Sequence, residues 1–476
     1  MSNFKQTKIV ATISDRRCDV DFIRELYDAG INVARLNTAH ISTESAAMEI
    51  KNIRAVSDKI AILVDTKGPE VRTCGIQEAL RFNAGDKAQI KGGEGVATKD
   101  CFYVSYKNFV ADVPEGGSVL IDDGEIALKV VGKTDDALQC IVENSGEIKN
   151  KKSVNVPGVT ISLPSITARD KEFIEFSADN EVDFIAHSFV RNAQDVKDVQ
   201  AILDAKGSDA KIIAKIENLD GVNNIDEILD HAYGVMVARG DLGIEVPAEK
   251  IPGMQRHLIR KCVARKKPVI IATQMLHTMI DNPRPTRAEV SDVASAIYYR
   301  TDAIMLSGET AYGKYPVEAV KTMAKIAHEV EASKDRRNDI VVPAIENEIP
   351  AYLAESAISA SRVFDTKAIV TDSTTGRTAR YLAAFRGDVP VFAKCYSKRV
   401  MRELALSYGV QADYFEPQKN KDKLVRRSLA DLREQGLLEN DDTVVYVGGS
   451  FGAGGGSTFM EIEKVDRLTQ KRGEER

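Results

Sequence analysis

Two charged side chains, Lys215 and Glu217, stand two residues apart at the end of an apolar run over residues 212–216. Side chains alternate between the faces of a strand, so residues spaced by two project to the same side. A second apolar run, 234–238, leads to Asp241, another carboxylate for the same edge. Two carboxylates and an ammonium suit a magnesium-bound, negatively charged substrate. The open alternative is a buried ion pair beside a turn aspartate.

Short apolar segments of this kind recur along the chain, and amphipathic stretches separate most of them. This alternation is typical of a parallel α/β architecture. Eight such units predict a (β/α)8 TIM barrel, a fold of the α/β class. The predicted strands cover residues 8–13, 32–36, 60–64, 182–186, 212–216, 234–238, 268–272 and 303–306.

Polar side chains follow the ends of the predicted strands. In a TIM barrel the active site lies at the carboxyl ends of the strands, so we expect these side chains to gather on one rim. They are Arg35, Asn37, Asp65, Thr66, Ser188, Lys215, Glu217, Asp241, Thr273, Ser307 and Glu309.

The strand spacing breaks once, between the third and fourth strands, where about a hundred residues intervene. Short β segments with glycine turns fill this stretch and predict an inserted all-β domain at residues 69–164, placed as a lid over the barrel mouth. The barrel then comprises residues 1–68 and 165–335. After a charged linker, residues 350–476 are predicted to form a C-terminal α/β domain.

A hydroxyl-rich loop, DSTTGRTA, follows the first predicted strand of that C-terminal domain and runs into an amphipathic helix. Backbone amides at a helix start, with nearby hydroxyls and a guanidinium, can bind a phosphate. An ordinary capped helix start is the alternative. The side chains concerned are Ser373, Thr374, Thr375, Arg377 and Thr378.

The composition argues against nucleic-acid and membrane partners. The 476 residues can form several cores, and 65 basic against 71 acidic residues give a net charge of −6 without a long basic block. Neither a signal-peptide region nor a membrane-length apolar run is evident, so we expect a soluble, cytoplasmic protein. Six cysteines without CxxC spacing and six histidines without paired spacing argue against disulfides and zinc.

Nine segments resemble the pyruvate kinase family, in the family's order and along nearly the whole chain. They are TKIVATI, VARLN, DTKGPEVRT, KSVNVPG, AKIEN, VMVARGDLGIEVP, PVIIATQML, NPRPTRAEVSDVA and MLSGETAYGKYPVEAV. The resemblance implies a barrel, a β lid and a C-terminal α/β domain, usually assembled as a homotetramer. It also implies the glycolytic transfer of a phosphoryl group from phosphoenolpyruvate to ADP, which gives pyruvate and ATP.

The resemblance further implies roles for residues on the rim. Glu217 and Asp241 match the ligands of Mg²⁺ or Mn²⁺. Lys215 matches the cation beside the transferring phosphoryl group, and Arg35 would hold the phosphate.

The other implied substrate contacts come from two strand ends. Backbone amides around Gly240 and Asp241 would receive the substrate carboxylate. Thr273 matches a hydroxyl of the proton relay, whose partner the sequence does not identify.

On the nucleotide side, Arg72 and Lys152 match residues that reach the ADP phosphates when the lid closes, and His40 matches a residue near the nucleotide. A solvated lysine in the run KNKK is the alternative for Lys152. Asp122 and Asp123 are better explained as a hairpin turn than as ligands. The DSTTGRTA loop lies where the family binds a phosphorylated sugar effector.

The chain departs from the family at its expected potassium site. Family members commonly carry a serine ligand where this chain has Ala39. Asn37, Asp65 and the carbonyl of Thr66 remain, and Glu70 is the residue of potassium-dependent members. We therefore expect K⁺ binding at a weakened site.

Two other functions are weighed against phosphoryl transfer. A metal-dependent barrel lyase or aldolase acting on a 2-oxo acid would use the same metal, lysine and enolate chemistry, but the lid and the C-terminal domain disfavour it. A catalytically impaired sugar-phosphate sensor is supported only by the change at Ala39 and by Ser14 and Asp15, which replace the Gly-Pro that family members commonly carry after the first strand.

Overall fold

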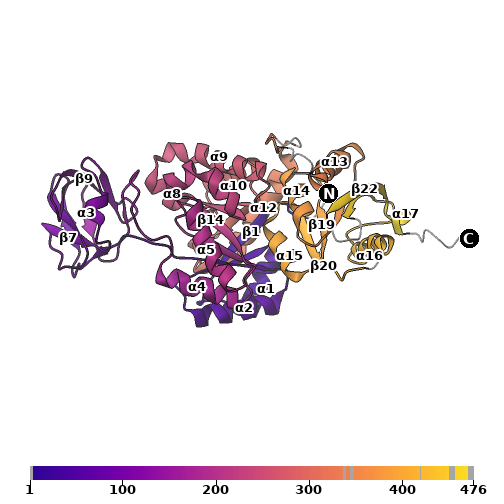
Figure 1. The fold of residues 1–476 in the computed structure, drawn as a ribbon, viewed down its shortest axis with the longest axis horizontal. Helices are drawn as coiled ribbons and strands as arrows, with labels where there is room; N and C mark the ends of the chain where they lie inside the picture. The colour runs from indigo at the N-terminus through magenta and orange to yellow at the C-terminus, as the bar shows by residue number, and fades with distance from the viewer. Residues whose placement is uncertain (1–3, 336–338, 344–347, 419, 450–455, 470–476) are drawn as a thin grey trace, which may run out of the picture.

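The computed structural model places three bodies in a row: a central barrel, an all-β lid on one side and a C-terminal α/β domain on the other (Figure 1). The structure describes residues 4–335, 339–343, 348–418, 420–449 and 456–469. Hydrophobic clusters mark each body, with one in the lid and others in the barrel and the C-terminal domain.

The barrel contains eight parallel strands, each within two residues of its predicted bounds, so the predicted fold class is confirmed. The strands close in the order β1-β17-β16-β15-β14-β13-β3-β2. Their bounds are β1 (Lys8–Ile13), β2 (Val33–Asn37), β3 (Ala61–Asp65), β13 (Phe184–His187), β14 (Lys211–Ile216), β15 (Gly234–Ala238), β16 (Val269–Ala272) and β17 (Ala303–Leu306).

Apolar side chains fill the barrel on both faces of its strands. Val10, Leu63 and Ile270 belong to the inner cluster, whereas neighbours such as Ile9 and Ile62 pack outward against the helices. Because both faces of each strand are buried, the strand sequences are continuous apolar runs. The surrounding helices are α1 (Val20–Ala29), α2 (Thr43–Val56), α4 (Ala168–Asp179), α5 (Ala193–Ala205), α6 (Leu219–Asn223), α7 (Ile225–His231), α8 (Arg239–Glu245), α9 (Ile251–Ala264), α10 (Arg287–Tyr298), α11 (Gly308–Ala311) and α12 (Pro316–Ser333).

Local sequence signals fix where several of these helices begin and end. Asp19 and Ser42 cap α1 and α2 with side-chain oxygens, and Gly30 ends α1 in the left-handed conformation. Thr167 and Asp170 form a reciprocal capping box at the start of α4. The helix α4 therefore begins at a defined point just after the chain returns from the lid.

The lid is built from antiparallel and mixed β pairs between β3 and α4, and it stands clear of the barrel in Figure 1. One sheet has the order β12-β8-β9-β10-β6-β7-β4, and β11 pairs with β5. The elements are β4 (Thr73–Cys74), β5 (Leu80–Phe82), β6 (Lys87–Gly92), β7 (Cys101–Val104), α3 (Phe109–Asp112), β8 (Ser118–Ile121), β9 (Ile126–Lys133), β10 (Leu138–Val142), β11 (Gly146–Ile148) and β12 (Val154–Asn155).

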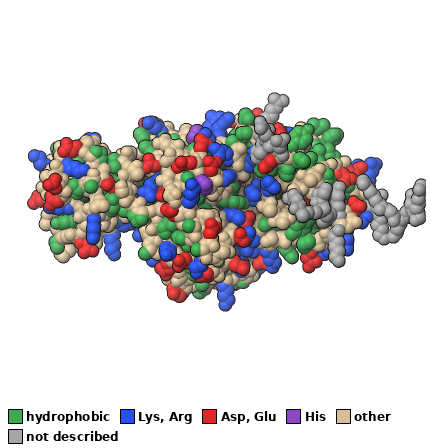
Figure 2. Space-filling view, viewed as in Figure 1, with side chains coloured by type: hydrophobic (Ala, Val, Ile, Leu, Met, Phe, Trp, Pro, Cys, Tyr) green, Lys and Arg blue, Asp and Glu red, His purple; other side chains and the backbone are tan. Residues whose placement is uncertain are grey.

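The C-terminal domain is a five-stranded sheet of order β20-β19-β18-β21-β22 with helices around it. Figure 2 shows hydrophobic side chains gathered over α13 (Ile349–Val363), where Ile349, Tyr352 and Val363 are exposed. The other elements are β18 (Ala368–Ser373), α14 (Arg377–Ala384), β19 (Val391–Cys395), α15 (Lys398–Glu403), β20 (Val410–Tyr414), α16 (Lys421–Glu434), β21 (Thr443–Gly449), β22 (Ser457–Lys464) and α17 (Val465–Thr469).

All six cysteines are free thiols in the structure. Across the described ranges, no helix combines the length and the hydrophobicity needed to cross a membrane.

Candidate active site

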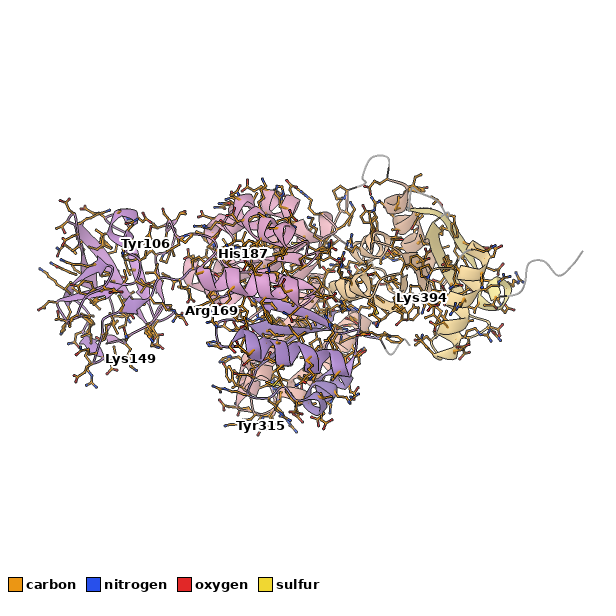
Figure 3. The ribbon with its side chains drawn as sticks, turned by 60° about the horizontal axis from the view of Figure 1, so that its bottom comes forward. Tyr106, Lys149, Arg169, His187, Tyr315 and Lys394 are labelled. Atoms are coloured by element: carbon orange, nitrogen blue, oxygen red, sulfur yellow. The ribbon has the colours of Figure 1, made fainter. Side chains whose placement is uncertain are left out.

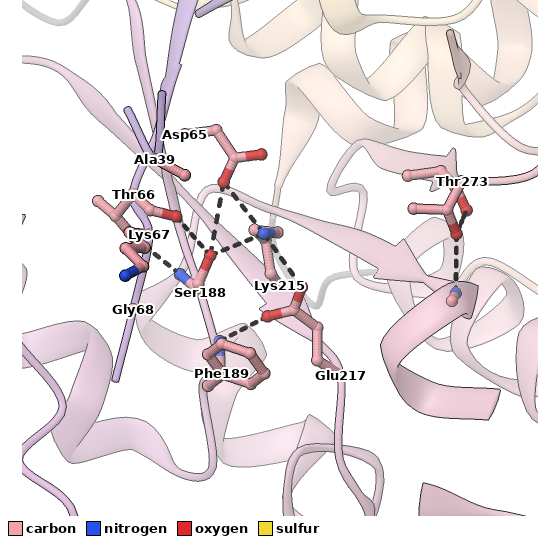
Figure 4. A network of polar contacts seen from close by, with 12 residues as sticks. Ala39, Asp65, Thr66, Lys67, Gly68, Ser188, Phe189, Lys215, Glu217 and Thr273 are labelled. Carbon is pink, nitrogen blue, oxygen red and sulfur yellow. Dashed lines mark hydrogen bonds and ion pairs between the residues drawn. The ribbon is translucent and has the colours of Figure 1, made fainter. Parts of the chain in front are cut away.

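Lys215 lies at the centre of a charged cluster on the barrel rim (Figure 4). Its ammonium contacts Asp65 Oδ1 at 3.1 Å and Glu217 Oε1 at 3.0 Å, and it donates a hydrogen bond to Ser188 Oγ at 2.7 Å. All four side chains are largely or fully buried. The buried ion pair considered from the sequence is therefore present, and it lies on the rim together with the other strand-end residues.

The charges of this cluster are unevenly compensated. Burial lowers the pKa of Lys215, but Asp65 and Glu217 outweigh it and raise that pKa above its usual value. Burial raises the pKa of Asp65, but Lys215 and Arg35 bring it below its ordinary range. Burial raises the pKa of Glu217 to about 7, and Asp241 and Asp65 add to this rise while Lys215 opposes it. A further cation beside Glu217 would therefore be favoured.

Ser188 and Phe189 connect the ends of β3, β13 and β14. Ser188 Oγ donates to the carbonyl of Thr66 at 2.7 Å, and the amide of Phe189 donates to Glu217 Oε2 at 2.7 Å. Phe189 adopts a positive φ of 56°, a backbone conformation that non-glycine residues seldom adopt. The sequence identified Ser188 only as a strand-end residue and gave no signal for the backbone contact of Phe189.

Arg35 is held in a fixed orientation at the end of β2. Its Nε donates to Asp65 Oδ2 at 2.6 Å, and its Nη1 donates to Thr12 Oγ1 at 2.9 Å. Its guanidinium is buried beside the same carboxylate that contacts Lys215. Two fixed cations thus share Asp65 on one side of the rim.

Gly240, Asp241 and Thr273 lie together at the ends of β15 and β16. The amide of Gly240 donates to Thr273 Oγ1 at 2.8 Å, and this hydroxyl donates to the carbonyl of Ala272 at 2.6 Å. Thr273 has a φ of 70° and its carbonyl accepts from Arg239 at 2.7 Å. The Gly240 amide, which we expected to face a substrate carboxylate, is hydrogen-bonded to Thr273 in this structure.

Asp241 lies in the first turn of α8, and burial raises its pKa. No ion pair to this carboxylate is recorded among the described residues. Asp241 and Glu217 line the same cavity, and both would be stabilised by positive charge. This donor set fits a hard divalent cation held by one or two carboxylates and completed by substrate oxygens. No group of three His, Cys, Asp or Glu side chains suited to a metal occurs in the described part of the chain.

A cavity of about 740 Å³ lies between the lid and the rim. Arg72 and Lys152 line it from the lid side, opposite Glu217 and Asp241. In this structure Arg72 pairs with Glu70 at 2.7 Å, and Lys152 pairs with Asp122 at 2.7 Å. Both residues expected to contact the nucleotide line this cavity, and both are paired with carboxylates of the lid and its connection to the barrel.

Asp122 and Asp123 form the turn between β8 and β9, and both have positive φ. The structure thus places them in the hairpin turn predicted from the sequence, with Asp122 also contacting Lys152.

The residues expected around K⁺ meet where β2 and β3 end. Asn37 and Asp65 are paired in register, and the Thr66 carbonyl lies next to them in sequence. Asn37 Oδ1 accepts from the amide of Ala39 at 3.2 Å, and the Thr66 carbonyl accepts from Ser188. Ala39 offers no side-chain oxygen.

His40 is exposed on the same loop between β2 and α2. It is not among the residues that line the cavity with Arg72 and Lys152, so its expected place near the nucleotide stays a prediction.

Two strand-end residues support the rim. Glu309 accepts hydrogen bonds from the amides of Ser307 at 2.8 Å and Leu276 at 3.1 Å, so its carboxylate fixes two loops.

The predicted effector loop is largely occupied by internal contacts. Ser373 Oγ accepts from the amide of Gly376 at 2.7 Å, and the hydroxyls of Thr378 and Ser457 lie 2.6 Å apart. Arg377 lies 3.8 Å from Glu348. Thr374 and Thr375 are exposed and line a different cavity of about 520 Å³ between the barrel and the C-terminal domain.

A barrel whose rim carries buried carboxylates and fixed cations, facing a lid that carries further cations, is the arrangement of an enzyme for anionic, phosphorylated substrates. The comparisons with known proteins specify this class. Residues 4–320 match the family model described as pyruvate kinase, barrel domain, and residues 352–463 match that of the pyruvate kinase alpha/beta domain.

Proteins similar to this chain along nearly its whole length are pyruvate kinases. The pyruvate kinase of Borreliella burgdorferi is 50% identical over 469 residues, covering 97% of this chain and 98% of that protein. The pyruvate kinase of Bacillus licheniformis is 42% identical over 481 residues, covering 98% and 82%. The crystal structure of a pyruvate kinase from Cryptosporidium parvum matches with a TM-score of 0.92 and 34% identity, covering 97% of this chain and 96% of that one.

The chain belongs to the pyruvate kinase family. Its function is that of the family, and it is therefore a phosphotransferase. The resemblance inferred from the sequence is confirmed.

Proposed function

We propose that this rim transfers the phosphoryl group of phosphoenolpyruvate to ADP and releases pyruvate and ATP, as a glycolytic enzyme of the cytoplasm. The observation that carries the proposal is the ammonium of Lys215, fixed by Asp65, Glu217 and Ser188 at the rim. A fixed cation offsets charge on the equatorial oxygens of a phosphoryl group and on a developing enolate. Arg35, held by Asp65 and Thr12, would bind the phosphate from the neighbouring strand.

Glu217 and Asp241 would hold the divalent cation, Mg²⁺ or Mn²⁺. When bound, this ion supplies Lewis-acid stabilisation of the phosphoryl and enolate oxygens. The two carboxylates fit this role because burial raises both of their pKa values and leaves them short of positive charge. Lys215 does not replace the metal, because Asp65 takes part of its charge.

The substrate carboxylate would lie near the start of α8, where Gly240 and Asp241 follow β15. In this proposal Thr273 belongs to the proton relay to the enolate carbon. Its hydroxyl is oriented by the Gly240 amide and the Ala272 carbonyl.

ADP would enter from the lid side of the cavity. Arg72 would leave its ion pair with Glu70, and Lys152 its pair with Asp122, to bind the ADP phosphates. His40 would lie near the nucleotide. These ion pairs are partly exposed, so their exchange costs little.

K⁺ would bind between Asn37, Asp65 and the Thr66 carbonyl, with one ligand fewer because of Ala39. We further propose a phosphorylated effector at Ser373, Thr374, Thr375, Arg377 and Thr378. A homotetramer is also proposed, and the exposed apolar side chains of α13 support an assembled state.

The test is incubation of the purified protein with phosphoenolpyruvate, ADP, Mg²⁺ and K⁺, with ATP and pyruvate measured separately. We expect equal amounts of both products. Pyruvate without ATP would indicate a different reaction on the same barrel, and no product from folded protein would favour a sensor.

A further inference from the structure

The carboxylate of Asp170 joins the two chain segments that connect the lid to the barrel. Asp170 is fully buried at the start of α4. Its Oδ1 accepts from the amides of Lys67 at 3.0 Å and Gly68 at 3.1 Å, on the segment that leaves the barrel. Its Oδ2 accepts from the amide of Thr167 at 3.0 Å and from the Thr167 hydroxyl at 2.6 Å, on the segment that returns.

Helix capping explains only half of these contacts. A capping box needs the reciprocal bonds between Thr167 and Asp170, and these are present. The amides of Lys67 and Gly68 belong to a segment about a hundred residues earlier and contribute nothing to the cap. The second oxygen of Asp170 therefore ties the outgoing segment to the returning one.

The outgoing segment is also packed tightly against the catalytic cluster. Gly68 has a φ of +73°, and a Cβ built there would lie 2.7 Å from the Phe189 ring and 2.8 Å from Ser188 Cβ. Ser188 accepts from Lys215, and the Phe189 amide donates to Glu217 (Figure 4). Gly68 is therefore confined on its barrel side by Ser188 and Phe189, and Asp170 fixes the same residue from the start of α4.

The neighbouring Arg169 makes a similar connection to the loop after β2. Its guanidinium donates to the carbonyls of Thr38, at 2.7 and 3.0 Å, and Ile41, at 2.7 Å. Figure 3 shows Arg169 on the side of the barrel that faces the lid. The start of α4 thus contacts the ends of both β2 and β3.

We propose that Asp170 is a positioning residue for the lid: it fixes the hinge at which the lid turns, so that Arg72 and Lys152 reach the cavity in register with the rim. This rests on the proposed role of the lid in binding ADP. Misplacement of binding groups by about 1 Å can reduce rates by two orders of magnitude. The phosphoenolpyruvate contacts proposed on β14, β15 and β16 do not involve this hinge.

The test compares Asp170→Ala with Thr167→Ala. Both variants lose the capping box, but only Asp170→Ala loses the bonds to Lys67 and Gly68. We expect the KM for ADP to rise about fivefold or more in Asp170→Ala, with the KM for phosphoenolpyruvate changed less than about twofold. In Thr167→Ala both KM values stay near those of the unmodified enzyme. Hydrogen exchange of the Lys67 and Gly68 amides, measured in parallel, reports whether the tie is lost.

The KM for ADP should follow the protection of those two amides in every variant that folds. If Asp170→Ala fails to fold, Asp170→Asn serves in its place, because an amide offers one accepting oxygen instead of two. A variant that loses this protection but keeps a normal KM for ADP would overturn the proposal, as would equal KM changes in the Thr167 and Asp170 variants. Failure of the proposed function is distinct, because it would show as absent ATP formation in the unmodified enzyme.

Discussion

The two ends of the barrel bury charges of the same kinds but pair them differently. At the end facing the C-terminal domain, Asp302 makes two bonds to Arg386, at 3.0 and 2.7 Å, and Asp183 contacts Arg402 at 2.6 Å. At the end facing the lid, Glu217 shares the Lys215 ammonium with Asp65. At one end each carboxylate has its own arginine and the pairs hold two domains together, whereas at the other end two carboxylates share one ammonium.

The largest expected effect is the loss of phosphoryl transfer in Lys215→Met. The substitution removes the fixed cation at the rim, so turnover should fall by about a thousandfold or more. Mn²⁺ binding should be largely retained, since the proposed metal ligands remain. A steady-state ATP assay and an Mn²⁺ titration check the two parts, and near-normal turnover would contradict the role given to Lys215.

At the opposite end, Arg386→Met should reduce stability and leave the chemistry intact. Asp302 would stay buried without its cation, which costs about 3–5 kcal/mol in the free energy of unfolding. The matched control is Lys398→Met, because Lys398 forms an exposed pair with Asp58 across the same two domains. It should cost at most about 1 kcal/mol in urea unfolding. Equal losses in the two variants would remove the distinction between buried and exposed pairs.

Glu49 of α2 is a buried carboxylate that no cation pairs with in the described part of the chain. Neither of its oxygens has a hydrogen-bond partner among the described residues, and burial, with a smaller contribution from Asp15, raises its pKa from the ordinary 4.5 to about 7. The folded protein then holds a proton that the unfolded chain releases, so stability falls as pH rises from about 4.5 through about 7.

Glu49→Gln should remove this dependence. Between pH 5 and pH 8 the free energy of unfolding of the variant should gain about 1–3 kcal/mol relative to the unmodified protein. Urea unfolding at the two pH values measures the gain. Parallel pH profiles for the two proteins would show that Glu49 is compensated in a way the structure does not record.

The smallest effect is expected from Ala39→Ser, which adds a hydroxyl beside Asn37. The concentration of K⁺ at half-maximal activity should fall several-fold, roughly the value of one added ligand, with little change in kcat. Activity titrated with KCl measures the shift, and Na⁺ at equal ionic strength is the control. An unchanged K⁺ dependence would place the monovalent ion elsewhere.

The strands of the barrel were predictable because burial on both faces makes them continuous apolar runs with polar residues at their carboxyl ends. The inserted lid was visible as a break in that spacing. Residue type and strand position were enough to bring Arg35, Asp65, Lys215 and Glu217 to one rim.

The contacts that connect this rim to the lid were not predictable. Asp170 has the sequence signal of a helix cap, and nothing in that signal shows that it also binds Lys67 and Gly68. The Phe189 contact depends on a backbone amide, which any residue type could provide. The lid carries several carboxylates, and the sequence does not show that Arg72 pairs with Glu70 and Lys152 with Asp122.

Titration of Mn²⁺ into the unmodified enzyme, Glu217→Gln and Arg386→Met separates the two ends of the barrel most directly. The rim is expected to bind one divalent ion, and Glu217→Gln should weaken that binding by roughly a hundredfold because one of two carboxylate ligands becomes neutral. Arg386→Met should bind as the unmodified enzyme does. Unchanged Mn²⁺ affinity in Glu217→Gln would contradict the claim that the uncompensated charge of the rim is a metal site.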